Sequence, residues 1–449
     1  MTEPPADLRR SLGFWGGTAI IVGTVIGVGI FRTPASIARV LPDPALTLGL
    51  WAVVGLIALC GALTMAELVT LLPKTGGTYV YLRAAYGDGA AFAFGWLYLL
   101  AATPAGMGAL AAGFGERLAE FCYGTVEAAP SAFVRAAGVG IVVVFTIVNV
   151  LGVRSGSVTQ GILTAVKVGA LLAVVLAASA LGGGKARGTL APGGTAGLPD
   201  LAAATASVFF TYNGWIYISL VAGEVDDPGR RAKRIVLASM GTIIVLYLGA
   251  NVAYLAMLPV SEMAAQKFVA VSVMDTLLGP VGGVLIGLCI MASILGALNG
   301  VILTKTRVPY ALARDGLSFA VLGRCHPRWA TPHVSILAQG VVAVVLILWL
   351  KHFDDLTAYF VVVEWFALVF GIAAVFVLRR TMPDSPRPFR VPAYPWVPLV
   401  FVVGTSVGLA AIVWSRLREG KWAPVIGLGI ALAGLPLHLL WRSVTKQRR

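Results

Sequence analysis

The chain has 449 residues, of which 58% are hydrophobic and 12% are charged, and its formal net charge is +14. An average soluble domain has about 25% charged residues, so this composition excludes a disordered chain, a coiled coil and an ordinary cytosolic enzyme. It also argues against a nucleic-acid binder, because a basic groove needs dense charge on a water-facing surface. We therefore expect membrane lipid around the chain and no nucleic-acid partner.

Apolar segments follow one another along nearly the whole chain. A helix that spans a membrane needs about 20 apolar residues. Segments of this kind lie at 14–38, 46–71, 89–119, 133–152, 158–181, 201–223, 235–258, 275–304, 334–350, 356–379, 395–415 and 422–441. The sequence thus predicts an all-α integral membrane protein with twelve transmembrane helices.

The distribution of lysine and arginine predicts the orientation of these spans. If the N-terminus is cytoplasmic, about 22 of the 34 positive residues fall on the cytoplasmic side and about 11 fall outside. Lys167 is then left as the single positive residue within the membrane. Cytoplasmic loops are normally richer in Lys and Arg, so we expect a multi-pass protein of the cell inner (plasma) membrane with both termini inside.

The first predicted span has glycine at its centre. Residues 13–31 read GFWGGTAIIVGTVIGVGIF, which places Gly27, Val28 and Gly29 near the middle of the membrane. Glycine lowers helix stability, and unwound backbone inside a membrane is tolerated where it lines a cavity. For this span alone, close packing between helices explains the glycines equally well.

The sixth predicted span repeats this feature. Residues 208–215 read VFFTYNGW, a polar and Gly-containing centre between apolar flanks. Two interrupted helices at corresponding places in two halves are typical of inverted-repeat transporters. Free N–H groups at a half-helix start attract an anion, and exposed carbonyls attract a cation. We therefore expect an amino acid zwitterion as the substrate.

Five segments resemble motifs of the amino acid–polyamine–organocation (APC) superfamily. They are GVGIF at 27–31, PKTGGTYVYLR at 73–83, EVDDP at 224–228 with two arginines behind it, YALARDG at 310–316 and PFRVPAYP at 388–395. Within this superfamily the chain is most similar to prokaryotic relatives of the L-type amino acid transporters. The resemblance implies a LeuT-type fold built as a 5+5 inverted repeat, with alternating access to a central site. The implied parts are a cytoplasmic N-terminus (1–13), a first repeat (14–182), a second repeat (201–380), two further helices (394–441) and a cytoplasmic C-terminus (442–449).

The resemblance also implies substrate-binding residues around the two breaks. The substrate carboxylate would meet the N–H groups of Gly27, Val28 and Gly29, and the ammonium would meet carbonyls near Val25, Phe210 and Asn213. Val28 replaces the family's common Ser, so no hydroxyl is available there.

Further positions match family residues around the site. Phe210 matches the aromatic residue that closes the site from outside, and Asn213 occupies a variable position suited to selectivity. Glu224 would belong to a cytoplasmic gate. Asn299 matches a residue lining the side-chain pocket, although a hydrogen bond between helices is a serious rival for it.

Two charged residues lie inside predicted spans. Lys167 is near the middle of the fifth span, where a lysine costs about 2.5–3.5 kcal/mol on insertion scales. It matches a lysine of sodium-independent family members, which implies a fixed cation in place of sodium; a side chain that extends to the interface is the alternative. Glu364 in the tenth span either faces the transport path and favours cationic groups, or packs between helices. Arg32 would lie in the outer vestibule with no assigned role.

We therefore predict a sodium-independent secondary transporter of neutral L-amino acids, working as an exchanger or with protons. The alternative within the superfamily is a cationic amino acid or polyamine transporter, for which Glu364 is the only local argument. The sequence contains no HExxH or GxSxG motif and no clustered histidines, so we expect no enzyme activity. A channel is a third possibility that saturable counterflow would exclude.

Cofactors and partners are not expected. The four cysteines have no metal-ligand or disulfide spacing, so we expect no metal and no cofactor. Eukaryotic L-type relatives pair with a glycoprotein subunit through a cysteine after the third span. Cys122 lies near that place, but a single cysteine does not establish a partner, and we expect no obligate protein partner.

Overall fold

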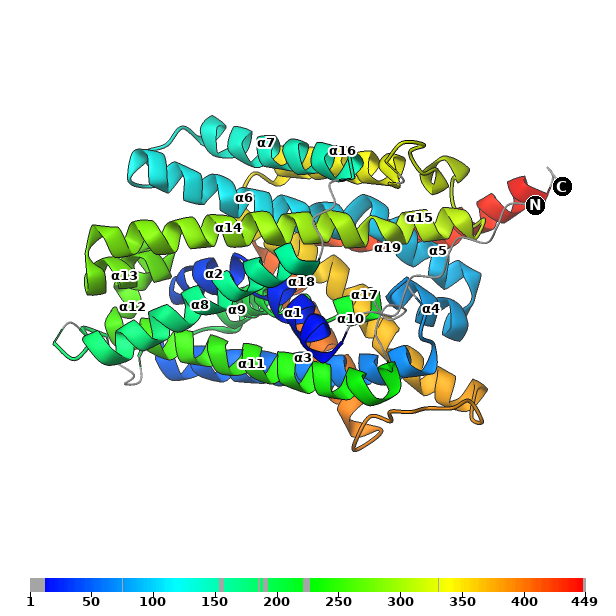
Figure 1. The fold of residues 1–449 in the computed structure, drawn as a ribbon, viewed down its shortest axis with the longest axis horizontal. Coiled ribbons are helices and arrows are strands. Elements are labelled where there is room, and N and C mark those ends of the chain that lie inside the picture. The colour runs from blue at the N-terminus through cyan, green and yellow to red at the C-terminus, as the bar shows by residue number, and fades with distance from the viewer. Residues whose placement is uncertain are drawn as a thin grey trace.

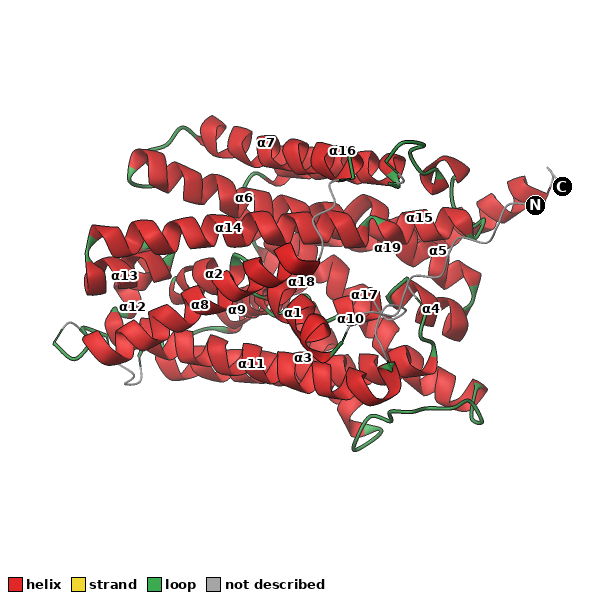
Figure 2. Ribbon diagram, in the orientation of Figure 1, coloured by secondary structure: helices red, strands yellow, loops and turns green. Residues whose placement is uncertain are grey.

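The structure, a computed structural model, describes residues 13–74, 76–152, 157–184, 186–188, 193–220, 227–329 and 331–446. Every regular element within these ranges is helical, which confirms the predicted all-α fold class (Figure 2). Eleven of the described helical segments are long and apolar enough to cross a membrane. Most of the long helices run along the long axis of the molecule (Figure 1).

The helices follow the predicted order. The first part of the chain forms α1 (Phe14–Val25), α2 (Gly29–Ala38), α3 (Pro44–Leu71), α4 (Thr78–Tyr86), α5 (Asp88–Leu97), the π-helical turn η1 (Tyr98–Ala102), α6 (Thr103–Tyr123), α7 (Ser131–Val150) and α8 (Ser157–Leu181). The second part forms α9 (Leu198–Thr211), α10 (Tyr217–Leu220), α11 (Pro228–Met257), α12 (Val260–Ala265), α13 (Val269–Leu278), α14 (Pro280–Lys305), α15 (Arg307–Arg314), the 3₁₀ turn η3 (Ala320–Gly323), α16 (His333–Leu350), α17 (Phe353–Thr381), α18 (Trp396–Arg418) and α19 (Ala423–Lys446).

Local sequence signals explain several helix starts. Asp43 precedes α3, and its carboxylate accepts a hydrogen bond from the N–H of Leu46 at 2.8 Å, while Pro44 occupies the first helical position. An acidic N-cap followed by proline is a favoured way to begin a helix. α14 likewise begins with Pro280. The sequence analysis, which followed the apolar segments alone, had begun these two spans at residues 46 and 275.

The sixth predicted span, 201–223, has a different form from the others. α9 is an apolar helix of 14 residues that ends at a break, and the short α10 follows it. Residues 221–226 lie outside the described part of the chain. The total of twelve spans therefore stays a prediction.

The third predicted span contains the π-helical turn η1, which the sequence analysis did not predict. A π-helical turn interrupts the regular bonding of a helix, and such turns are frequent at functional sites. The carbonyl of Tyr98 accepts a hydrogen bond from the side-chain nitrogen of Gln339 in α16 at 3.0 Å. This contact gives the carbonyl a hydrogen-bond partner in a region where lipid cannot supply one.

The broken helices lie at the centre of the bundle. α1, α2, α9 and α10 are enclosed between α3 and α11 on one side and α6, α7 and α16 on the other (Figure 1). The two ends of the bundle are distinct. We call them the α13 end, where α2, α12 and α13 lie, and the α15 end, where α4, α15 and the end of α19 lie (Figure 1).

Candidate functional site

Both predicted helix breaks are present and they touch each other. α1 ends at Val25 and α2 begins at Gly29, while α9 ends at Thr211. A Cβ atom at Gly29 would lie 2.6 Å from Oγ1 of Thr211, so glycine is required for this approach. The hydroxyl of Thr33 in α2 is 3.0 Å from the Thr211 hydroxyl. The start of α2 is therefore packed directly against the end of α9.

Tyr247 of α11 joins the two breaks from a third helix. Its hydroxyl lies 2.9 Å from the carbonyl oxygen of Val25 and 3.3 Å from that of Thr211. The last carbonyls of a helix have no partner inside the helix, and here one phenol serves the ends of α1 and α9. The sequence analysis missed this residue. A tyrosine within the apolar seventh span was the available signal, since a buried hydroxyl normally has a partner.

A cavity of about 50 Å³ lies between the breaks. It is lined by Thr24, Val25, Gly27, Val28, Gly29, Gly106, Leu110, Phe210, Thr211, Asn213, Gly214, Tyr217, Ala297, Val301, Lys305 and Phe360. The structure thus brings together six predicted site residues, which are Val25, Gly27, Val28, Gly29, Phe210 and Asn213.

The cavity is lined by residues at the start of α2 and at the ends of α1 and α9, so backbone donors and acceptors both lie beside it. The first N–H groups of α2 have no acceptor within the helix and form the positive end of its dipole. The ends of α1 and α9 present carbonyls. The side-chain nitrogen of Asn213 is buried without a hydrogen-bond partner in the described part of the protein. Because buried polar groups are normally paired, this nitrogen is a donor available to a bound molecule.

Phe210 lines the cavity and packs against two further aromatic rings. Its ring meets Phe353 and Phe360 edge to face, with centroids 5.6 and 5.8 Å apart. The guanidinium of Arg32 lies 4.8 Å from the centre of the Phe353 ring. These aromatic rings therefore lie between the cavity and the charged side chain of Arg32.

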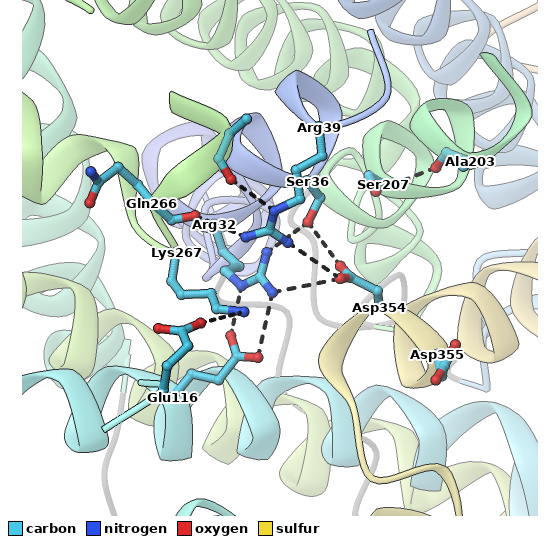
Figure 3. A network of polar contacts seen from close by, with 12 residues as sticks. Arg32, Ser36, Arg39, Glu116, Ala203, Ser207, Gln266, Lys267, Asp354 and Asp355 are labelled. Carbon is cyan, nitrogen blue, oxygen red and sulfur yellow. Dashed lines mark hydrogen bonds and ion pairs between the residues drawn. The ribbon is translucent and has the colours of Figure 1, made fainter. Parts of the chain in front are cut away.

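Arg32 belongs to a charged network that joins four helices, α2, α6, α12 and α17 (Figure 3). Arg32 of α2 is 1% exposed, and its Nε donates to Glu116 of α6 at 2.7 Å. Its Nη1 donates to Ser36 at 2.6 Å, and the Ser36 hydroxyl donates to Asp354 of α17 at 2.8 Å. Arg39 continues the network to the carbonyl of Ala264 in α12 at 2.9 Å. The network holds α2 against α6 and α17 at the α13 end.

Lys167 of α8 binds the end of α1. Its ammonium donates to the carbonyl of Gly23 at 2.8 Å, and the side chain is 1% exposed. The lysine is therefore an internal bridge between the fifth span and the first, and it does not extend to the membrane surface. That it takes the place of a sodium ion stays a prediction.

Lys305 corrects the sequence analysis, which ended the eighth span at residue 304 and so counted this lysine among the 22 positive residues of the cytoplasmic side. It is the last residue of α14, it is 1% exposed, and it lines the cavity. Lys167 is therefore not the single lysine inside the bundle. The spacing of Ala297, Val301 and Lys305 puts them on one face of α14, but nothing in the sequence shows that this face lines the cavity.

Glu364 of α17 is the partner of Lys305. The Lys305 ammonium lies 2.6 Å from Oε1 of Glu364, and the Tyr98 hydroxyl donates to the same oxygen at 2.9 Å. Glu364 is completely buried. The carboxylate is therefore held by an ion pair between α14 and α17, with the π-helical turn η1 supplying the third group.

Two predicted residues are not brought to the cavity. Asn299 is absent from the cavity lining, and its side-chain oxygen accepts a hydrogen bond from Asn149 of α7 at 2.9 Å. It contributes to a separate hollow beside Trp329 and Thr331. The rival interpretation, a hydrogen bond between helices, is what the structure contains. Glu224 lies outside the described residues.

Polar contacts also join helices at the α15 end. Asp315 lies 2.6 Å from the hydroxyl of Tyr79 and 2.6 Å from Arg83, both in α4. Glu67 of α3 is fully buried and accepts two hydrogen bonds from Arg379 of α17, at 2.9 and 2.6 Å. Within the described residues, no group of three or more His, Cys, Asp or Glu side chains is arranged to hold a metal ion.

Residues 12–432 match the protein family described as amino acid permease. The chain is 30% identical to the serine/threonine exchanger SteT of Bacillus subtilis (strain 168), with 96% of each chain covered. It is 28% identical to the b(0,+)-type amino acid transporter 1 of Mus musculus, over 97% of this chain and 88% of that one. It is also 28% identical to the cystine/glutamate transporter of Homo sapiens, over 100% of this chain and 89% of that one.

Proposed function

The chain belongs to the amino acid permease family, and from this premise we propose that it is a sodium-independent exchanger of small neutral L-amino acids. The family and its relatives are transporters, not enzymes, and the apolar helices make this a multi-pass membrane protein. The observation that carries the proposal is the cavity between two touching helix breaks.

An amino acid zwitterion matches the two kinds of backbone group in this cavity. We infer that its carboxylate binds the N–H groups of Gly27, Val28 and Gly29, where the dipole of α2 favours negative charge. Its ammonium binds the carbonyls near Val25, Phe210 and Asn213. Val28 offers no hydroxyl, so the carboxylate depends on backbone donors.

The size and charge of the cavity favour small neutral side chains. On the same measure a single water needs about 10–15 Å³, so 50 Å³ suits a small amino acid. The serine/threonine exchanger among the relatives is named for small substrates. The cationic alternative depended on Glu364, and Lys305 already pairs with that carboxylate.

The fixed ammonium of Lys167 supports independence from sodium. It binds the carbonyl of Gly23 in the last turn of α1, and a mobile cation would serve that same purpose in a sodium-coupled protein. We propose that the chain needs no cofactor and no second protein for transport.

We propose that the protein works by alternating access between the two ends of the bundle. We propose that residues 14–182 and 201–380 are the inverted repeats, each beginning with a broken helix, and that the α15 end faces the cytoplasm. Phe210 and the Arg32 network then close the site from outside. Contacts of Asp315 and Glu67 join helices at the inner end, where Glu224 is also expected to act.

Counterflow into proteoliposomes tests the function. Liposomes with purified protein and internal unlabelled alanine should accumulate external labelled alanine or serine with saturation, and equally well when choline replaces sodium. Uptake that requires sodium, or flux that does not saturate, would contradict the proposal. Uptake driven by a pH gradient without internal amino acid would instead indicate proton coupling.

A further inference from the structure

The Lys305 ammonium occupies an enclosure that has the chemistry of a cation site. Besides Glu364 at 2.6 Å, three aromatic rings surround the nitrogen. Their centroids lie 5.2 Å (Phe360), 5.5 Å (Tyr98) and 5.9 Å (Tyr217) from it. A ring within about 6 Å attracts a cation through its negative face. The carboxylate and the three rings therefore all attract the ammonium.

This enclosure, formed by Glu364, Tyr98, Tyr217 and Phe360, opens onto the substrate cavity. Tyr217, Phe360 and Lys305 all belong to the cavity lining. The second oxygen of Glu364 is buried and has no hydrogen-bond partner in the described part of the protein. The enclosure therefore has the composition of a site for an ammonium or guanidinium group beside the substrate cavity. In this protein the Lys305 side chain occupies it.

Lys305 is also the one charged side chain among the described residues that line the cavity. A second positive group brought into this space would face a like charge in a region shielded from water, where such interactions are strong. It would also find the carboxylate already engaged.

We propose that Lys305 determines specificity: its tethered ammonium occupies a cation site at the side-chain end of the cavity and thereby excludes amino acids with cationic side chains. This inference rests on the proposed function, because it concerns the same cavity. It predicts that removal of the tethered cation converts the cavity into a site for lysine or arginine.

Three variants in the counterflow assay test this inference. Lys305→Met removes the charge and keeps a linear side chain, Glu364→Gln removes the carboxylate, and the double variant removes both. The ratio of labelled lysine uptake to labelled alanine uptake should be near background in the wild type. It should rise at least about tenfold in Lys305→Met, since the like charge is gone and the carboxylate is free. It should stay near background in Glu364→Gln and in the double variant.

The outcomes separate this inference from the proposed function. If the wild type exchanges no amino acid, the proposed function fails. If the wild type exchanges alanine but also takes up lysine, the inference alone is overturned. The same holds if the Lys305→Met variant takes up no more lysine than background. If Lys305→Met does not fold, inhibition of wild-type alanine exchange by lysine or arginine gives the decision, because strong inhibition contradicts exclusion. A gain in the double variant equal to that in Lys305→Met would also overturn it, since the carboxylate would then play no part.

Discussion

Two buried lysines hold the polar centre of the bundle in different ways. Lys167 donates to a backbone carbonyl at the end of α1, whereas Lys305 pairs with a carboxylate beside the cavity. A buried ammonium without a partner is costly, and each of these has one. Their partners lie in different kinds of helix: Gly23 belongs to a broken helix, and Glu364 lies within the continuous α17. We therefore expect Lys167 to act on movement and Lys305 to act on selectivity.

Substitution of Lys167 by alanine should reduce counterflow at least about tenfold. A hydrogen bond to a charged group contributes about 1.5–3 kcal/mol, and 1.4 kcal/mol is a factor of ten. The end of α1 would lose its bond to α8. Rates in proteoliposomes reconstituted with equal protein measure the effect, and size-exclusion chromatography checks that the variant is folded.

Lys421→Ala is the matched control for this prediction. Lys421 is exposed and pairs with Asp355 and Glu419 at the surface, where ion pairs contribute little. Its removal should leave counterflow close to the wild-type rate. A Lys167→Ala variant with wild-type kinetics would show that the bond to Gly23 has no part in transport.

At the scale of elements, the two halves of the first broken helix are fastened to different neighbours. α1 is bound to α8 by Lys167 and to α11 by Tyr247, whereas α2 is bound to α6 and α17 through Arg32. Residues 26–28 between them are not part of either helix. Hinges are typically a few residues at the ends of elements, so α2 can leave its neighbours while α1 stays in place.

Weakening of the Arg32 network should therefore open the α13 end. Glu116→Gln removes the charge that Arg32 contacts, and breaking one member of a buried ion pair costs about 3–5 kcal/mol. In a variant without native cysteines, a cysteine at Leu110, which lines the cavity, should react several-fold faster with a membrane-impermeant maleimide added to intact cells. Labelling is stopped at successive times, and the labelled fraction at each time gives this rate.

Glu120→Gln provides the comparison. Glu120 pairs with Arg117 one turn away on the same helix, α6, so its loss should not separate α2 from α6. Equal acceleration by both substitutions would mean that the effect is a general loosening of α6 and that the Arg32 network does not close the site.

The elements and breaks were predictable because their signals are local. Glycine and asparagine inside apolar runs mark the breaks, and proline and aspartate mark helix starts. The pairing of Lys305 with Glu364, the position of Tyr247 and the partner of Asn299 depend on which helices are neighbours. A membrane helix is apolar toward lipid and toward its neighbours, so the periodicity that reveals the buried face of a soluble helix is weak here. The resemblance to a family located Lys167 within the fifth span and Phe210 at the second helix break. Lys305 was counted on the cytoplasmic side because it is the last residue of α14 and a basic segment follows it.

At the scale of the whole molecule, the cavity lies between the Arg32 network at the α13 end and the Lys305–Glu364 pair on the side of the α15 end. Phe210, Phe353 and the Arg32 network cover it at the α13 end. Its lining follows α14 from Ala297 through Val301 to Lys305, toward the α15 end. With the α15 end in the cytoplasm, as proposed, the Arg32 network would close the outer path, and Lys305, which is 1% exposed, would lie on the inner side of the cavity.

Two native cysteines make the orientation directly testable. Cys122 is exposed near the end of α6 at the α13 end, and Cys325 is exposed shortly after α15 and η3 at the α15 end. The excess of Lys and Arg in the segments next to Cys325 predicts that this end is cytoplasmic. A membrane-impermeant maleimide should therefore label Cys122 in intact cells and Cys325 in inside-out vesicles.

The single variants Cys122→Ser and Cys325→Ser serve as each other's controls. In intact cells the Cys122→Ser protein should stay unlabelled, while the Cys325→Ser protein should be labelled as fully as the wild type; inside-out vesicles should reverse the two results. Cys60 is buried and contributes no background, and Cys289, which is partly exposed within α14, is replaced by serine in every protein compared. Labelling of Cys325 from outside would invert the proposed orientation, and then the Arg32 network would close the cytoplasmic path, with Lys305 facing the exterior.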